Sequence, residues 1–200
     1  MRIATFFTEG YYEQVASNYI VPSAQKLGID LLQIKVPSLH NWKKNTALKA
    51  DIFRTFFSEY KDDLALIDAD ATFERYPEML YNIPSEYDIA YHNFDTDLFW
   101  HGRSGGKKHL CSGTLVIRNN PIGRELVETW KNENERNPHV LEQMNLNNLI
   151  VSRFKDRLKS YELPIEYLAI VLRDGNIPSY IKEPVIIHHQ ASRISKRMEL

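Results

Sequence analysis

The first 70 residues alternate between two hydrophobic patterns, and this alternation limits the possible fold more than any other feature. Short apolar runs with strand-like composition occur at residues 2–7, 30–36 and 64–67. Between them, apolar residues recur at helical spacing from residue 12 to 27, with a kink expected at Pro22, and again after a cap at Asn45 or Thr46. Strand–helix–strand–helix–strand order is typical of a parallel, doubly wound α/β sheet.

The remaining chain supplies further elements of both kinds. Strands are expected at residues 87–94, 110–119 and 183–190, and helices at 121–132 and about 140–160. The chain contains no internal repeat and no low-complexity linker, and its 200 residues suit one domain. We therefore expect a single α/β domain over residues 1–200.

Composition limits the setting in which the protein works. Hydrophobic residues make up 43% and charged residues 26% of the chain, which is ordinary for a soluble globular protein. The formal net charge of −1 gives no overall field that would attract nucleic acid or an anionic membrane. A single cysteine, Cys111, excludes an internal disulfide, and the sequence has neither a signal-peptide pattern nor a membrane-spanning run. We therefore expect a cytoplasmic protein.

Two carboxylates follow the third apolar run, in the segment LALIDADATF. Asp68 and Asp70 stand one residue apart at the carboxyl end of this strand, which is where ligands bind in open α/β sheets. Two carboxylates with open coordination positions suit Mg²⁺ or Mn²⁺, which keep waters and bind phosphate oxygens. The same residues can also serve only to cap a turn or a helix start, so the spacing alone leaves both interpretations open.

Two known chemistries use an Asp-x-Asp at such a place. DADAT matches the D-x-D-x-T pattern of phosphatases that form an aspartyl-phosphate, in which Asp68 would be the nucleophile. That motif usually follows the first strand, and a later strand ends in further acids. Here the motif follows the third strand, and the strand at 183–190 ends in histidines. In the second chemistry, nucleotide-sugar transfer, the acids hold a divalent cation against a diphosphate.

Six segments, spread in order over nearly the whole chain, carry a family resemblance. They are LKADIFRTFF, LALIDADATF, CSGTLVIRNNPIGRELVETW, LEQMNLNNLI, LPIEYLAI and PVIIHHQASRISK. Together they resemble the GT-A glycosyltransferases, which use nucleotide-diphosphate sugars and carry a D-x-D motif. The resemblance implies a Rossmann-like α/β fold with a mixed, mostly parallel sheet flanked by helices. It also implies a nucleotide-binding half, residues 1–94, and an acceptor and donor-sugar half, residues 95–200, that contains a C-terminal metal-binding strand.

The resemblance assigns a metal site that would hold Mn²⁺ or Mg²⁺. Asp70 would be the main ligand, Asp68 would touch the metal or the ribose, and His188 would complete the set from the last strand. His189 ranks lower, because consecutive side chains of a regular strand face opposite sides. Two carboxylates, an imidazole and diphosphate oxygens form an acceptable ligand set for Mn²⁺.

The same resemblance assigns positions to the nucleotide-diphosphate sugar donor. Tyr11 or Tyr12 would stack on a uracil ring, and Lys49 would face the acid pair or the phosphates. The backbone at Ser112 and Gly113 would approach the donor sugar closely, which explains a glycine there. The complete donor-binding set is Thr8, Gly10, Tyr11, Lys49, Asp68, Ser112, Gly113, Arg193 and Lys196.

Three residues are assigned to catalysis: Glu142, Gln143 and Asp97. Glu142 and Gln143 occupy the family's Asp-Gln position, with a glutamate one methylene longer than the usual aspartate. In an inverting enzyme such an acid can be the general base on the acceptor hydroxyl, and in a retaining enzyme a group in this region lies under the reacting carbon. Asp97 would meet donor-sugar hydroxyls or serve as a turn residue. Arg193 and Lys196 would stabilise charge on the departing diphosphate.

The expected activity is therefore metal-dependent transfer of a hexosyl or pentosyl group from a UDP-sugar to an acceptor hydroxyl. The loop at residues 101–109 would close over the donor and exclude water. The rivals are a phosphatase and a nucleotide-sugar-binding module without catalysis. A sugar-nucleotide pyrophosphorylase would need a glycine-rich, basic loop after the first strand, and TEGYYE has one glycine and no basic residue.

The acceptor stays open at this point. A glycan, a lipid-linked sugar, a protein side chain and a modified nucleic-acid base all fit the pattern. Basic residues in the glycine-rich loop, Arg103, Lys107 and Lys108, could meet a polyanion, and salt-dependent binding would support that.

Overall fold

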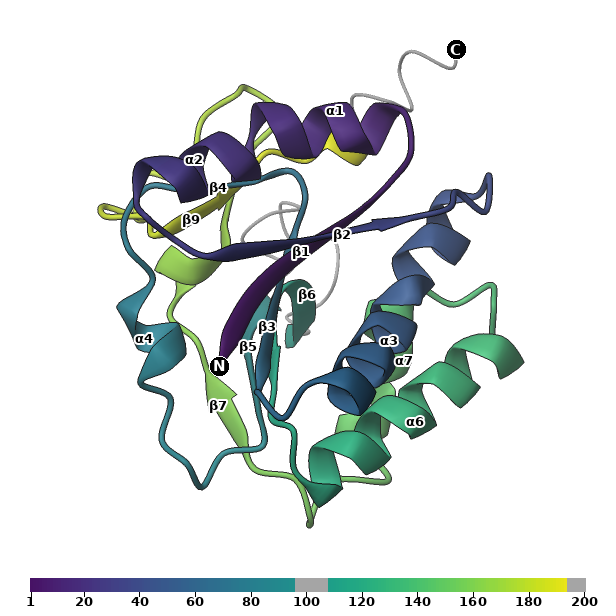
Figure 1. Cartoon of the computed structure of the whole chain (residues 1–200). Coiled ribbons are helices and arrows are strands. Elements are labelled where there is room, and N and C mark those ends of the chain that lie inside the picture. The colour runs from purple at the N-terminus through teal and green to yellow at the C-terminus, as the bar shows by residue number, and fades with distance from the viewer. Residues whose placement is uncertain (96–107, 194–200) are drawn as a thin grey trace.

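The computed structural model describes residues 1–95 and 108–193. A six-stranded sheet with the order β2-β1-β3-β6-β5-β7 forms the centre of the molecule (Figure 1). Its strands are β1 (Arg2–Thr8), β2 (Leu31–Val36), β3 (Leu64–Asp68), β5 (Ile89–Asp95), β6 (Lys108–Ile117) and β7 (Ser160–Glu162). The pairs β1–β2, β1–β3 and β5–β7 are parallel, whereas β6 runs antiparallel to both β3 and β5. The expected mixed, mostly parallel α/β sheet is confirmed.

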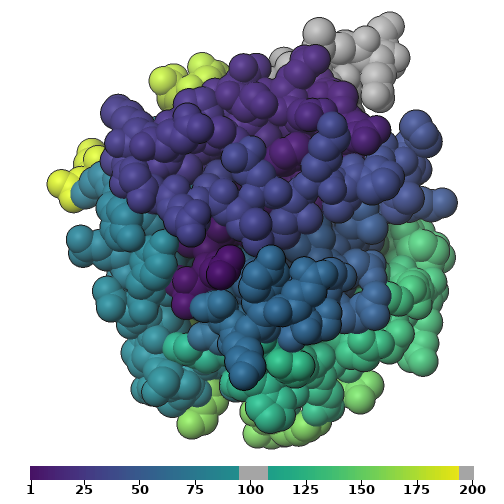
Figure 2. All heavy atoms as spheres, in the orientation of Figure 1, coloured from purple at the N-terminus to yellow at the C-terminus, as the bar shows by residue number. Residues whose placement is uncertain are grey.

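Helices cover both faces of this sheet. They are α1 (Tyr11–Asn18), α2 (Ile20–Lys26), α3 (Trp42–Glu59), α4 (Glu78–Tyr81), α6 (Pro121–Arg136) and α7 (Glu142–Val151). On one face, α3, α6 and α7 bury a core that includes Phe53 and Trp130, whose ring centroids lie 6.4 Å apart. On the other face, α1, α2 and α4 bury a second core with Ile20 and Leu80. In the space-filling view the N-terminal segments, in purple and blue, form much of the upper part of the face shown (Figure 2). No helix among these described residues is long and apolar enough to cross a membrane.

A second, three-stranded sheet links the acid pair to the C-terminal part of the chain. It contains β4 (Ala71–Phe73), β9 (Ile186–His188) and β8 (Ala169–Ile170), which follows a 3₁₀ turn over Ile165–Leu168. β4 pairs antiparallel with β9, so that Ala71 lies opposite His188. Because Asp70 directly precedes Ala71, this pairing brings His188 to the end of β3. The apolar pattern at 183–190 predicts a late strand but does not identify its partner.

Several element boundaries differ from the sequence-based prediction, and three of these differences, all in helices, are informative. The first helical segment breaks at Tyr19 and not at Pro22, because the proline ring excludes the carbonyl of the residue four positions earlier, Asn18. α3 begins at residue 42, because the side chain of Asn41 accepts the backbone N–H of Lys44 at 3.1 Å.

The last predicted helix, 140–160, is shorter in the structure and ends at Val151. The apolar periodicity that suggested a longer helix is real, since Phe154 and Leu158 are both buried in the core under α3 and α6. These residues lie in irregular backbone beyond the end of α7. The apolar pattern therefore predicted the burial of Phe154 and Leu158 correctly, but it predicted the wrong backbone conformation for them.

Candidate functional site

A cavity of about 430 Å³ opens where β1 and β3 end, which is the carboxyl edge of the parallel part of the sheet. The first turns of α3, the segment 111–113 of β6, the start of α7 and residues after β9 complete its wall. The predicted site residues among its lining are Thr8, Lys49, Asp68, Asp70, Ser112, Gly113, Glu142, Gln143 and Arg193. The sheet edge thus brings together residues that are far apart in the sequence.

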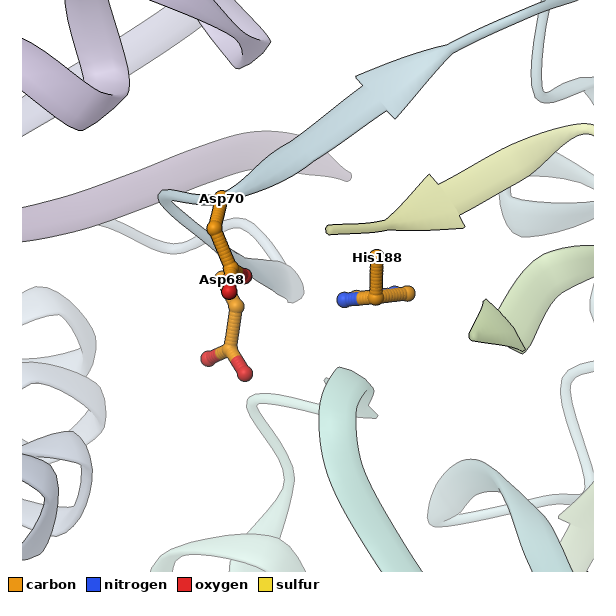
Figure 3. Close-up of side chains that lie close together, drawn as sticks. All are labelled: Asp68, Asp70 and His188. Atoms are coloured by element: carbon orange, nitrogen blue, oxygen red, sulfur yellow. The ribbon is translucent and has the colours of Figure 1, made fainter. Parts of the chain in front are cut away.

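Asp68, Asp70 and His188 form a cluster at the edge of this cavity. Each side chain offers one ligand atom, and these atoms all lie within 4.8 Å of one another. Asp68 is the last residue of β3, Asp70 lies in the turn before β4, and His188 ends β9. Figure 3 shows the imidazole edge-on, with one ring nitrogen directed toward the two aspartates. The two carboxylates and the imidazole can therefore reach one common ion.

The electrostatics of the cluster favour a cation between these groups. Burial, together with repulsion from Asp68, raises the pKa of Asp70 to about 6, although the backbone N–H of Ala191 donates to its Oδ2 at 2.7 Å. Burial lowers the pKa of His188 to about 4, which leaves the imidazole neutral, the form that binds metals. Hard carboxylate oxygens with one imidazole are a suitable donor set for Mn²⁺ or Mg²⁺. The residues present fit the metal that the family resemblance implies.

Lys49 projects from α3 into the same region and is only 3% exposed. Its Nζ lies 2.8 Å from Oδ1 of Asp68 and 3.0 Å from both the carbonyl oxygen and the Oγ of Ser112. An ammonium group has three protons, and these three oxygens use all of them. Burial alone would lower the pKa of Lys49, but the charges of Asp68 and Glu142 outweigh burial and raise it. The Lys49 ammonium therefore contacts Asp68, one member of the acid pair.

Ser112 connects Lys49 to the start of α7. Its Oγ accepts from Lys49 and donates to Oε1 of Glu142 at 2.8 Å, and its backbone N–H donates to Oε1 of Gln143 at 3.0 Å. Oε2 of Glu142 is buried and has no hydrogen-bond partner among the described residues. Burial raises the pKa of Glu142. The site therefore holds one buried carboxylate oxygen that a hydroxyl group of a substrate could satisfy.

Several predicted site residues do not lie among the described residues that line the cavity. Gly10 and Tyr11 do not line the cavity, and the hydroxyl of Tyr11 donates to the carbonyl of Ala191 at 3.2 Å, whereas Tyr12 does line it. Asp97 and Lys196 lie outside the described residues, as do Arg103, Lys107 and most of the loop 101–109.

His189 is turned away from the acid pair. Its Nε2 lies 3.0 Å from Oγ1 of Thr72, and its ring packs on Tyr19 with centroids 4.6 Å apart. Among the described residues, His188 is the histidine in the acid cluster. This arrangement is the one expected from side chains that alternate along a strand.

Gly113 has a tight neighbour that the sequence did not reveal. A Cβ at this position would lie 3.0 Å from Cε1 and 3.2 Å from Nδ1 of His188. The close approach that a glycine permits here is therefore an approach of β6 to the histidine ring.

Sequence reasoning missed a group of cavity residues at the start of α3: Trp42, Asn45 and Thr46. Asn45 and Thr46 were interpreted as helix caps, and Trp42 was passed over. The available signal was the tryptophan in the polar stretch SLHNWKKN after the second strand, because ligands bind beyond strand ends in open α/β sheets and their pockets are rich in aromatic side chains.

The chain is similar to known sugar transferases in sequence and in fold. The family model for nucleotide-diphospho-sugar transferases matches residues 35–198. No curated protein matches the sequence. The fold is similar to the crystal structure of a glycosyltransferase involved in the glycosylation of the major capsid of PBCV-1, with a TM-score of 0.68, 10% identity and full coverage of both chains.

Two further structures share the fold at similar identity. The apo structure of the bifunctional glycosyltransferase WbbM has a TM-score of 0.56 and 11% identity, over 95% of this chain and 45% of that one. The apo form of mouse xyloside xylosyltransferase 1 has a TM-score of 0.52 and 11% identity, over 96% and 98% of the two chains.

The fold is that of the GT-A-like glycosyltransferases. The chain belongs to the nucleotide-diphospho-sugar transferase family. This membership selects the nucleotide-sugar interpretation of the D-x-D segment over the phosphatase interpretation, in which Asp68 was the nucleophile.

Proposed function

We propose that the protein is a metal-dependent transferase that moves a hexosyl or pentosyl group from a UDP-sugar to an acceptor hydroxyl. The observation that carries this proposal is the cluster of Asp68, Asp70 and His188, whose ligand atoms lie within 4.8 Å of one another beside the cavity. Two carboxylates and a neutral imidazole suit Mn²⁺ or Mg²⁺ and leave positions open for diphosphate oxygens. The family supplies the class of donor.

The proposed roles of the charged residues follow from their contacts. A cation held by the cluster would supply positive charge at the leaving diphosphate. Arg193, which lines the cavity, and Lys196, beyond the described residues, would add to that charge. Lys49 has a different task, because Asp68 and Ser112 already use its three protons. It holds Asp68 and, through Ser112, Glu142 in place.

Glu142 is the group that we assign to the acceptor proton if the reaction inverts configuration. The acceptor oxygen bonds to the anomeric carbon as the bond from that carbon to the diphosphate oxygen breaks, and the hydroxyl proton passes to Oε2 of Glu142. The unpartnered state of that oxygen among the described residues supports this role. In a retaining reaction, Glu142 or Gln143 would lie under the reacting carbon, and Asp97 would meet sugar hydroxyls in either case. The anomeric configuration of the product, measured by NMR, distinguishes the two.

The proposed division of the chain is a nucleotide-binding half, residues 1–94, and an acceptor and donor-sugar half, residues 95–200. Tyr12, on the cavity wall, is the aromatic residue that we assign to the uracil ring. Thr8, at the end of β1, lies on the same wall. Asp68 and Asp70 stand near the end of the first half, and His188 comes from the second.

The experiment that tests this proposal is calorimetric titration of the chelator-treated protein with UDP, with and without Mn²⁺. We expect binding that requires the metal and is lost in Asp70→Asn. Asp62→Asn is the matched control, because Asp62 precedes the same strand at the opposite end of the sheet and is 42% exposed. Equal UDP binding by Asp70→Asn, or binding without any metal, would contradict the proposed metal site.

A second measurement separates an enzyme from a module that only binds nucleotide sugars. A screen of UDP-sugars with the Mn²⁺-loaded protein, followed by release of UDP, detects both transfer and slow hydrolysis by water. Release that disappears in Glu142→Gln while UDP binding persists is the expected outcome. Metal-dependent binding without UDP release from any donor would favour the module.

A further inference from the structure

Thr114 makes a buried contact with Nε2 of His188, on the edge of the ring that is turned away from the acid pair. Thr114 lies in β6, one residue after Gly113, and is 1% exposed. Its Oγ1 lies 3.0 Å from Nε2 of His188 and 2.9 Å from the carbonyl oxygen of Tyr167. The strands β6 and β9 belong to different sheets, so this hydroxyl joins the central sheet to the strand that carries His188.

Counting protons fixes the direction of both hydrogen bonds. A carbonyl oxygen can only accept, so the single proton of the Thr114 hydroxyl goes to Tyr167. The same hydroxyl must then accept the proton carried by Nε2 of His188. With Nε2 protonated, the neutral ring has its lone pair on Nδ1. Figure 3 shows one ring nitrogen directed toward Asp68 and Asp70, and because Nε2 contacts Thr114, that nitrogen is Nδ1.

We propose that Thr114 is a positioning residue for the metal site: it accepts the Nε2–H of His188 and so holds the ring with its Nδ1 lone pair facing Asp68 and Asp70. The inference rests on the proposed function, because it concerns the same cation site. A hydrogen bond to the second nitrogen of a ligating histidine fixes the tautomer and the ring orientation, and loss of such a partner commonly weakens metal binding. Gly113 supports the arrangement, because it lets β6 approach the same ring.

The chain contains its own control for this inference. His189 makes the equivalent contact with Thr72, whose Oγ1 lies 3.0 Å from Nε2 of that ring. His189 lies outside the acid cluster, so the Thr72–His189 pair shares the chemistry of the Thr114–His188 pair without its place at the cation site. Thr→Val substitution at the two positions removes one hydroxyl at nearly constant volume in each case.

The first test is direct and needs no variant. Long-range ¹H–¹⁵N correlation spectra of the metal-free, wild-type protein report which nitrogen of each histidine carries the proton. We expect His188 to be protonated at Nε2 with a free Nδ1. A ring protonated at Nδ1 would overturn the proposal. Assignment of the signal uses its loss in His188→Gln.

The second test measures Mn²⁺ affinity by electron paramagnetic resonance. We expect Thr114→Val to weaken Mn²⁺ binding about tenfold or more, Thr114→Ser to restore it, and Thr72→Val to leave it unchanged. Thermal unfolding of each variant identifies any loss of fold, and the Thr114→Ser protein keeps the test available if Thr114→Val does not fold. Equal affinity of folded wild type and Thr114→Val would overturn the role of Thr114 alone. Absence of Mn²⁺ binding by the wild type would overturn the proposed metal site as well.

Discussion

Nζ of Lys49 lies 2.8 Å from Oδ1 of Asp68, so one of the two aspartates already has a counter-ion inside the protein. The same ammonium lies 3.5 Å from Oε1 of Glu142. Asp68, Asp70 and Glu142 together carry three negative charges when ionised, and Lys49 carries one positive charge. When all four are ionised, these groups together carry a net charge of −2, which a single divalent cation would neutralise.

Replacing Lys49 should destabilise the fold as well as the site. Lys49→Met leaves Glu142 buried and Asp68 partly buried without a counter-ion, and breaking such a pair costs about 3 kcal/mol. Because the side chain of Asp68 is 36% exposed and water screens its charge, we expect a free-energy cost at the lower end of the range for fully buried pairs. Urea denaturation of the metal-free protein measures the effect. Lys44→Met, at an exposed position of the same helix, is the matched control. A Lys49→Met protein as stable as the wild type would show that the ammonium has no structural role.

Gly113→Ala should disturb the histidine without removing any ligand. The added methyl group would lie 3.0 Å from Cε1 of His188 and 3.3 Å from Cδ1 of Leu168, so the ring or β6 must shift. We expect a loss of stability of about 1–3 kcal/mol, as for other overpacked sites, together with weaker Mn²⁺ binding. Denaturation and metal titration on the same sample check both effects. Unchanged Mn²⁺ affinity would mean that the ring can move without loss of its ligand position.

Tyr12 should contribute more to nucleotide binding than its neighbour Tyr11. Tyr12 lines the cavity, whereas the hydroxyl of Tyr11 is bonded to the carbonyl of Ala191. Stacking of an aromatic side chain on a base contributes about 1–3 kcal/mol, so Tyr12→Leu should weaken UDP binding about tenfold or more. Tyr11→Leu, which removes the ring in the same way, should leave the affinity for UDP close to that of the wild type. Calorimetry with UDP and Mn²⁺ compares the two, and a larger effect at Tyr11 would reverse the assignment.

Cys111 should react slowly with alkylating reagents although it lines the cavity. Burial raises the pKa of its thiol to about 12, and the thiolate is the reactive form. At pH 8 only about one thiol in 10⁴ would then be ionised, and labelling should accelerate as the pH rises toward 12. Mass spectrometry after iodoacetamide treatment follows the reaction, with the urea-unfolded protein as the fast reference. Rapid labelling of the native protein at pH 8 would contradict the raised pKa.

Local pattern was sufficient to predict the acid pair and every strand of the central sheet except β7, where a helix was expected instead. The apolar runs gave β1, β2 and β3, and the D-x-D placed two carboxylates at a strand end, because these features depend only on neighbouring residues. The antiparallel direction of β6 was not predictable in the same way. Strand direction depends on how the chain returns to the sheet, and that is a property of distant segments.

The contacts within the candidate site also depend on distant segments, so local sequence patterns could not predict them. The helical spacing placed Lys49 on α3 but could not reveal that Asp68 and Ser112 saturate its three protons. The pairing of Ala71 with His188 joins positions more than 100 residues apart, and no local pattern encodes it. Pro22 correctly predicted that the first helical segment is interrupted, but the break lies at Tyr19, about one turn earlier. The steric effect of proline acts on the preceding turn.

The register between β4 and β9 also determines how the site responds to small insertions and deletions. In the observed register Ala71 pairs with His188, and the next residue of the chain is a second histidine. A slip of one position normally turns every side chain of a strand to the opposite face. Here a slip that drew β9 back by one residue would present another imidazole, that of His189, to the aspartates. Because a second histidine follows His188, the chain leading into β9 can become one residue shorter and still place an imidazole opposite Ala71, whereas a slip in the other direction would place Ile187 there.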